Sequence, residues 1–172
     1  NVRVKLDWVD AEVFERDDQR VTAVATPGDR ISCDLVINAA GSWAGEVGAL
    51  AGLNIPVRPY RRCVYMTEPF AQIPGPIPLT IDVGSGFYMR KEQDNVLFGM
   101  SNLAEPPSHN LQIDWEWLDT VLECGLARFP ILERAGLAEK LCWAGTYEIT
   151  PDNMPILGRH PDLTNYLDAS GF

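Results

Sequence analysis

The residues most suited to chemistry lie in the stretch 143–158, which reads WAGTYEITPDNMPILG. It holds two glycines and two prolines, and Asp152 stands between the prolines. Proline fixes the backbone, an aspartate side chain can hydrogen-bond amides in a turn, and glycine lets a ligand approach the backbone closely. A hydrophobic core alone does not require this mixture. We therefore interpret the stretch as backbone shaped against a flat ligand, with a structural loop that binds nothing as the alternative.

A second candidate lies at residues 38–43, which read NAAGSW and follow an apolar run. Small residues at the end of a strand allow close approach by a ligand, and the start of a following helix favours anionic groups. Alanine and glycine are also common in turns that bind nothing. An ordinary strand-to-helix turn therefore remains the alternative reading of this segment.

These two segments, together with the ending NYLDASGF at 165–172, resemble the FAD-dependent amine and amino-acid oxidoreductases. That family includes D-amino-acid oxidase, glycine oxidase and sarcosine oxidase. The resemblance implies that strand 34–38 and its small-residue end lie beside FAD, and that 143–158 passes the flavin ring. The cofactor-binding residues that it implies are Ala40, Gly41, Ser42, Trp43, Gly145, Asp152, Pro155, Ile156, Gly158, Gly171 and Phe172.

Three departures from family patterns refine this expectation. Gly145 stands where covalent-flavin sarcosine oxidases carry the cysteine that holds the flavin, which implies noncovalent FAD. Tyr147 stands where relatives of glycine oxidase carry a carboxylate-clamping arginine, and a tyrosine cannot form a bidentate ion pair. The active-site histidine of monomeric sarcosine oxidases falls near Ser101. Within the family the chain most resembles sarcosine oxidase β-subunit-like dehydrogenases and oxidases of N-alkylated amino acids. This resemblance implies hydride transfer from a secondary or tertiary amine, such as an N-alkyl amino acid, to the flavin.

Residues that could bind such a small amine or amino-acid substrate lie in the middle of the chain. Alternation along a strand puts Arg61 and Arg62 on opposite faces, whereas Tyr88 and Arg90 share a face. Surface arginines are the alternative. The predicted substrate-binding residues are Arg62, Tyr88, Arg90, Met100 and Tyr147. Because the cofactor carries the chemistry, no catalytic side chain is predicted, and His160 is interpreted as a turn residue. Oxygen or a redox partner is the expected electron acceptor.

Hydrophobic periodicity and turn residues give the elements that must position these groups. Strands are expected at 2–6, 11–16, 20–26 and 31–37, the last covered on both faces, and then at 57–67, 79–81, 86–90, 96–100 and 165–171. Ser42 is expected to cap a helix that Gly52 ends, and Asp114 one that Pro130 ends.

The predicted fold class is α/β plus α+β. It comprises part of a glutathione-reductase-type FAD-binding layer, formed by 1–54 and 143–172, and an inserted antiparallel-sheet substrate domain at 55–142.

Composition narrows the function classes. The net charge of −10, from 14 basic and 24 acidic residues, argues against nucleic acid or an anionic membrane as partner. No apolar run approaches the roughly 20 residues that span a bilayer. The cysteines at 33, 63, 124 and 142 form no C-x-x-C pair, which argues against zinc and favours free thiols in a reducing, cytoplasmic location.

The chain begins without methionine in an alternating pattern and stops at Phe172, which suggests a fragment of a longer protein. It has no G-x-G-x-x-G motif for the pyrophosphate, so we expect the isolated chain to be inactive. Two rival functions remain. One is a non-catalytic assembly or scaffolding subunit with the same fold. The other is an NAD-type dehydrogenase, which the proline-rich stretch 150–158 disfavours.

Overall fold

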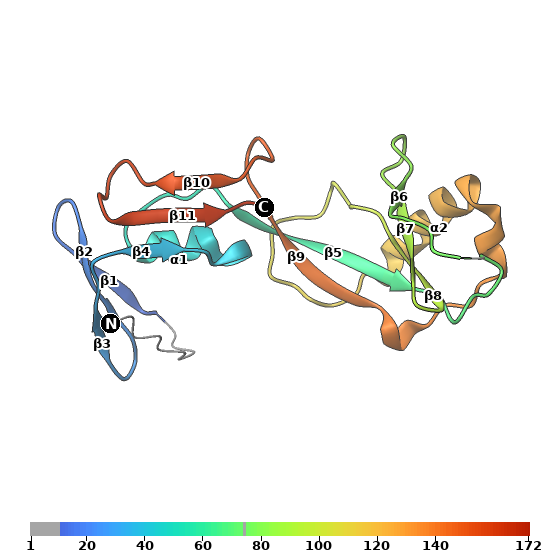
Figure 1. The fold of residues 1–172 in the computed structure, drawn as a ribbon, viewed down its shortest axis with the longest axis horizontal. Coiled ribbons are helices and arrows are strands. Elements are labelled where there is room, and N and C mark those ends of the chain that lie inside the picture. The colour runs from blue at the N-terminus through green and yellow to red at the C-terminus, as the bar shows by residue number, and fades with distance from the viewer. Residues whose placement is uncertain (1–10, 74) are drawn as a thin grey trace. The chain divides into compact units, whose positions relative to one another are not determined.

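The computed structural model describes residues 11–73 and 75–172, and the strand expected at 2–6 lies outside this part of the chain. The chain divides into two compact units (Figure 1). The first consists of Asn1–Pro59 and Tyr147–Phe172, and the second of Tyr60–Thr146.

The first unit opens with a small antiparallel sheet in the order β1-β2-β3. Its strands are β1 (Val13–Arg16), β2 (Val21–Ala25) and β3 (Arg30–Ser32). The Asp17 carboxylate accepts hydrogen bonds from the backbone N–H groups of Gln19 and Arg20, at 2.9 and 2.7 Å, and so shapes the β1–β2 turn. The strands predicted at 11–16 and 20–26 are confirmed.

The second sheet of this unit has the order β10-β11-β4. It contains β4 (Val36–Asn38), β10 (Ile156–Arg159) and β11 (Tyr166–Ser170). Strand β11 runs parallel to β4 and antiparallel to β10 (Figure 1). Strand β11 is therefore the central strand of this layer, with a parallel neighbour on one side and an antiparallel one on the other.

The prediction of a single strand at 31–37 is wrong. The strand is interrupted at residues 33–35, and its two parts, β3 and β4, belong to different sheets. The expectation that it is covered on both faces is also not met, because Ile37 is 60% exposed. Asn165, which is buried, joins these two sheets. Its side-chain amide donates to the carbonyls of Val21 and Asp34, at 2.8 and 3.0 Å, and its oxygen accepts from the Val21 N–H.

A short helix follows β4 directly. The chain forms a 3₁₀ turn, Gly41–Trp43, and then α1 (Ala44–Leu50). Ser42 therefore does not cap the helix as predicted, because it lies inside the 3₁₀ turn. Gly52 adopts a φ of +69°, a left-handed conformation that ends the helix as expected.

The second unit is built on one five-stranded sheet in the order β6-β7-β8-β5-β9. Its strands are β5 (Arg58–Met66), β6 (Thr80–Ile81), β7 (Tyr88–Glu92), β8 (Asn95–Gly99) and β9 (Trp143–Ile149). The pairs β6–β7, β7–β8 and β5–β8 are antiparallel. The strands predicted at 57–67, 79–81, 86–90 and 96–100 are confirmed to within two residues at each end.

Helix α2 (Trp115–Arg128) covers one face of this sheet. The Asp114 carboxylate caps it by accepting from the Trp117 N–H at 2.9 Å, as the sequence predicted. Phe129 follows its last turn, directly before Pro130. The buried core between helix and sheet includes Tyr65, Phe87, Met89, Val96, Phe98, Leu118 and Val121.

Candidate functional site

The carboxyl ends of β4 and β11 form one edge of the sheet in the first unit. Asp168 pairs with Asn38 in parallel register, so the segments that follow each strand leave the sheet side by side. Strand β10 runs the opposite way and begins at this edge, where Ile156 pairs with Ser170. Open α/β sheets bind ligands beyond the carboxyl ends of their strands. We call this place the strand-end edge; it comprises Ala40, Gly41, Pro155, Ile156 and Gly171.

Both glycines of the strand-end edge have backbone conformations that disfavour side chains. Gly41 has a φ of +58° and Gly171 a φ of +79°, both in the left-handed region. A Cβ atom on Gly171 would lie 2.5 Å from Thr150 Cγ2 and 3.4 Å from the carbonyl oxygen of Met154. The backbone of Gly171 is therefore packed as closely as glycine allows.

The turn at residues 150–155 packs against Gly171. The Thr150 hydroxyl, which is buried, donates to the Met154 carbonyl at 2.8 Å. Asp152 Oδ1 accepts from the Met154 N–H at 3.1 Å, and Asn153 has a φ of 58°. In this structure Asp152 shapes the turn, while Thr150 provides the surface against Gly171.

Glu148 belongs to this site and was missed in the sequence. Its Oε2 accepts a hydrogen bond of 2.6 Å from the Gly171 N–H. Its Oε1 lies 4.0 Å from the position that a Cβ of Gly41 would occupy. One carboxylate thus reaches the ends of both parallel strands. The sequence feature that could have indicated Glu148 is that it is the one charged residue between 143 and 151.

A polar pair is buried directly beneath the strand-end edge. The Asn38 amide donates to the Ala44 carbonyl at 2.9 Å and to Asp168 Oδ1 at 3.3 Å. Asp168 is only 2% exposed, and burial raises the pKa of its carboxyl group. Proximity to His160 and the hydrogen bond from Asn38 lower that pKa again in part. These contacts tie α1, β4 and β11 together under the edge.

The remaining predicted cofactor residues occupy varied places. Phe172 follows Gly171 and is 75% exposed, and Trp43 ends the 3₁₀ turn and is also exposed. Gly158 lies farther along β10, opposite Asp168. Gly145 belongs to the second unit. Glycines follow β4 and β11, and the exposed aromatic side chains of Trp43 and Phe172 lie close to them in the chain. Such surroundings suit a flat, partly apolar ring, so the residues present fit a flavin.

In the second unit, Tyr88 lies across the sheet face opposite α2. It pairs with Gly99 of β8, and a Cβ on Gly99 would lie 2.6 Å from the Tyr88 hydroxyl oxygen. The same Cβ would lie 2.9 Å from the carbonyl oxygen of Cys63 in β5. The absence of a side chain at Gly99 therefore lets the tyrosine extend over β8 towards β5.

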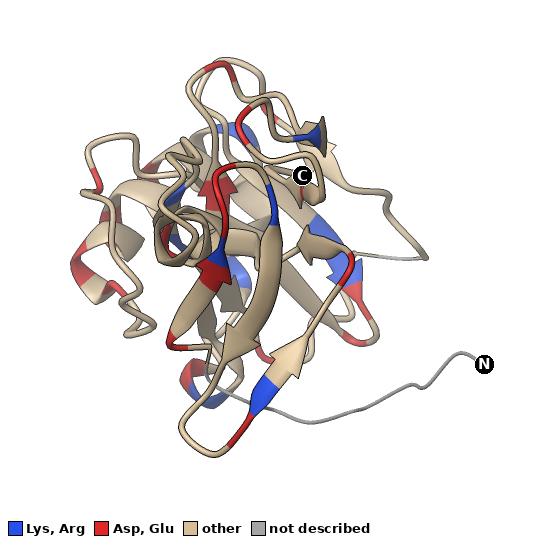
Figure 2. Ribbon diagram, turned by 90° about the vertical axis from the view of Figure 1, so that its left-hand side faces the viewer, with Lys and Arg blue, Asp and Glu red and all other residues tan. Residues whose placement is uncertain are grey.

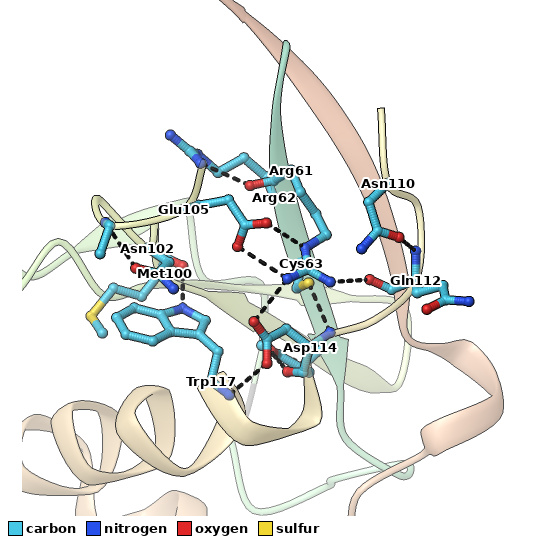
Figure 3. Close-up of polar contacts among 12 residues, drawn as sticks. Arg61, Arg62, Cys63, Met100, Asn102, Glu105, Asn110, Gln112, Asp114 and Trp117 are labelled. Atoms are coloured by element: carbon cyan, nitrogen blue, oxygen red, sulfur yellow. Dashed lines mark hydrogen bonds and ion pairs between the residues drawn. The ribbon is translucent and has the colours of Figure 1, made fainter. Parts of the chain in front are cut away.

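The two neighbouring arginines of β5 have different surroundings (Figure 3). Arg61 forms ion pairs with Glu105 at 3.0 Å and Asp114 at 2.9 Å, and the Glu105 bond raises the pKa of its guanidinium. Arg61 also donates to the carbonyl of Gln112 at 2.8 Å. Arg62 lies apart from this cluster, donates to the Arg61 carbonyl and lies 5.8 Å from the centre of the Tyr60 ring. Arg61 thus anchors the loop before α2, and Arg62 stays a predicted substrate-binding residue.

The other predicted substrate residues, which stay predictions, have varied surroundings. Arg90 forms an ion pair with Glu92 at 2.7 Å on the surface. Met100 is buried in the core, and its carbonyl accepts from the Trp117 indole at 3.0 Å. Tyr147 is exposed and belongs to the first unit. His160 accepts from the Asp162 N–H at 3.2 Å, which is a turn contact as the sequence indicated.

The distribution of charge, the cysteines and the placement of metal-ligating side chains indicate no further candidate site among the described residues. Figure 2 shows the acidic positions spread over helices, strands and loops. The four cysteines are free thiols. Within 11–73 and 75–172, no three His, Cys, Asp or Glu side chains gather to hold a metal ion. In the same residues, no helix is long and apolar enough to cross a membrane.

Comparison with known proteins identifies relatives in sequence. The chain is 29% identical over 168 residues to mitochondrial dimethylglycine dehydrogenase of Mus musculus, with 87% of this chain and 19% of that protein covered. It is 36% identical over 160 residues to FAD-dependent oxidoreductase domain-containing protein 1 of Xenopus laevis, with 83% and 31% covered. The chain thus spans a third or less of these relatives. A cytoplasmic location stays a prediction, since the first relative is named as mitochondrial.

Solved structures give the same picture of the fold. L-proline dehydrogenase of P. horikoshii superposes with a TM-score of 0.85 at 27% identity, over 97% of this chain and 45% of that one. Glycine oxidase of Geobacillus kaustophilus has a TM-score of 0.77 at 21% identity, over 96% and 43%. These neighbours confirm the predicted fold class. The family model described as "FAD dependent oxidoreductase" matches residues 9–172, so the chain belongs to this FAD-dependent family, abbreviated DAO.

Proposed function

We propose that the protein containing this chain oxidises a secondary or tertiary amine, such as an N-alkyl amino acid, with noncovalently bound FAD. The observation that carries the proposal is the strand-end edge, where Gly41 and the closely packed Gly171 follow two parallel strands. The exposed rings of Trp43 and Phe172 lie close by in the chain. The family is FAD dependent, and the named relatives include dimethylglycine and sarcosine dehydrogenases. Gly145 offers no nucleophile for a covalent flavin link.

The residues of this chain would bind and orient, and the cofactor would supply the chemistry. When bound, FAD accepts a hydride from the carbon beside the amine nitrogen. The flavin ring would contact Gly41, Pro155 and Gly171, and Phe172 would shield it from water. In the second unit, Arg62 and Tyr88 would hold a substrate carboxylate, since a guanidinium and a phenol both donate hydrogen bonds.

The test is a visible absorption spectrum of the natural full-length protein, recorded before and after anaerobic addition of sarcosine, dimethylglycine or proline. Flavin bands that bleach with one of these amines would support the proposal. A protein that purifies without flavin and does not bind added FAD would contradict it, and would favour the non-catalytic assembly subunit.

The substrate residues are tested by Tyr88→Phe in the same protein. Loss of one hydrogen bond to a charged group costs about 1.5–3 kcal/mol, so we expect KM to rise by about tenfold or more. Arg128→Gln is the matched control, because Arg128 is an exposed arginine of the same unit that lies 3.8 Å from Asp82. Equal KM values for wild type and Tyr88→Phe would remove Tyr88 from the substrate site.

A further inference from the structure

The end of β11 contains an N–H group that the sheet does not satisfy. Strand β11 ends at Ser170, so the N–H of Gly171 lies beyond the ladder with β10, whose first residue, Ile156, already faces Ser170. Gly171 is nevertheless buried. A buried N–H without an acceptor is costly, and the acceptor here is Glu148 Oε2 at 2.6 Å.

The surroundings of Glu148 fit a structural task at this edge better than an ordinary solvated side chain. Glu148 is half-buried in β9, and among the described residues no lysine or arginine forms an ion pair with it. Its second oxygen approaches the Gly41 position at 4.0 Å. Gly171 is held from the other side by Thr150, so its backbone is fixed between a carboxylate and a methyl group.

From this geometry we propose that Glu148 is a positioning residue for the cofactor. Its carboxylate fixes the Gly171 amide and thereby sets the backbone at which FAD would contact the ends of β4 and β11. This inference rests on the proposed function of the strand-end edge. The role requires a hydrogen-bond acceptor at Glu148, which a glutamine also supplies, and not a negative charge.

The experiment uses Glu148→Ala and Glu148→Gln in the natural full-length protein, with Glu12→Ala as matched control. Glu12 is an exposed glutamate in the same unit. The first readout is the Kd for FAD, measured by titrating cofactor-free protein and following flavin fluorescence. The second readout is the hydrogen-exchange rate of the Gly171 amide in cofactor-free protein, which needs no cofactor at all.

Glu148→Ala is expected to weaken FAD binding by about tenfold or more, because the buried Gly171 N–H then has no acceptor. It should also accelerate Gly171 exchange by about tenfold or more. Glu148→Gln is expected to stay within about threefold of wild type in both readouts. Glu12→Ala should match wild type.

Wild-type values for Glu148→Ala in either readout would overturn the role of Glu148. So would a Glu148→Gln variant as impaired as Glu148→Ala, because charge rather than acceptor capacity would then matter. If wild-type protein bound no FAD, the proposed function would fail and the cofactor role with it. Gly171 exchange would still report on the hydrogen bond in that case, so the two failures are distinguishable.

Discussion

At the scale of single residues, Gly171 matters both for the packing of the strand-end edge and for the proposed contact with the cofactor. Its φ of +79° strains any other residue, and its missing Cβ leaves room for Thr150. We expect Gly171→Ala to lower the free energy of unfolding by about 2–5 kcal/mol, combining backbone strain with overpacking. Urea denaturation of the full-length protein measures this loss.

The control for that substitution is Gly28→Ala. No heavy atom lies within 4 Å of a Cβ built on Gly28, and its φ is not in the left-handed region. We expect a change within about 0.5 kcal/mol there. Equal denaturation midpoints for the two variants would show that the strand-end edge tolerates a side chain.

Asp168 gives a prediction about pH. Burial raises the pKa of its carboxyl group above the ordinary value of 3.8. Between the ordinary and the raised pKa the folded state binds more protons than the unfolded state, so stability falls as pH rises through this window. Asn cannot ionise, and Asp168→Asn should therefore be more stable than wild type at neutral pH. The difference should shrink as pH falls through the raised pKa, because Asp168 is protonated in the folded state below it.

Thermal unfolding of both proteins across this pH range measures the effect. Asp162→Asn is the matched control, because Asp162 is exposed and lies near the same histidine, at 3.9 Å from His160 Nδ1. A stability difference that is the same at every pH would contradict the assignment of the raised pKa to Asp168.

At the scale of elements, local chemistry predicted most of the fold. Helix α2 followed from the Asp114 cap, one apolar face and Pro130, all of which act within a few residues. The break between β3 and β4 could not be predicted, because an apolar run reads the same whether it stays in one sheet or changes sheets. Glu148 was missed for a similar reason. Its partner Gly171 is distant in sequence, and only the fold brings them together.

The cap of α2 carries a second function that can be measured. Asp114 caps the helix and also pairs with Arg61, whose side chain is 13% exposed. We expect Asp114→Ala to cost about 1–3 kcal/mol, as the sum of a lost cap and a lost partner for a largely buried cation. Asp114→Asn retains an acceptor for Trp117 and should cost less. Urea midpoints measure both.

Asp119→Ala is the control for this pair of variants, since Asp119 is exposed on the same helix and should change stability by no more than about 0.5 kcal/mol. If Asp114→Asn were as damaging as Asp114→Ala, the ion pair with Arg61 rather than the cap would dominate the loss.

At the scale of the whole molecule, the proposed chemistry needs more than the two units described. The strand-end edge offers glycines from β4 and β11, but this sequence has no G-x-G-x-x-G turn to hold a pyrophosphate. The chain covers 45% of L-proline dehydrogenase and 43% of glycine oxidase. We therefore propose the cofactor chemistry for the protein that contains this chain and not for residues 1–172 alone.

This leads to a prediction for residues 1–172 produced alone. We expect no flavin-dependent oxidation of sarcosine, dimethylglycine or proline by the isolated chain, even with added FAD, because no dinucleotide-binding turn would orient the cofactor. The assay is reduction of an artificial electron acceptor, with the full-length protein as positive control. Turnover by the isolated chain would contradict this prediction and would show that residues 1–172 suffice for catalysis.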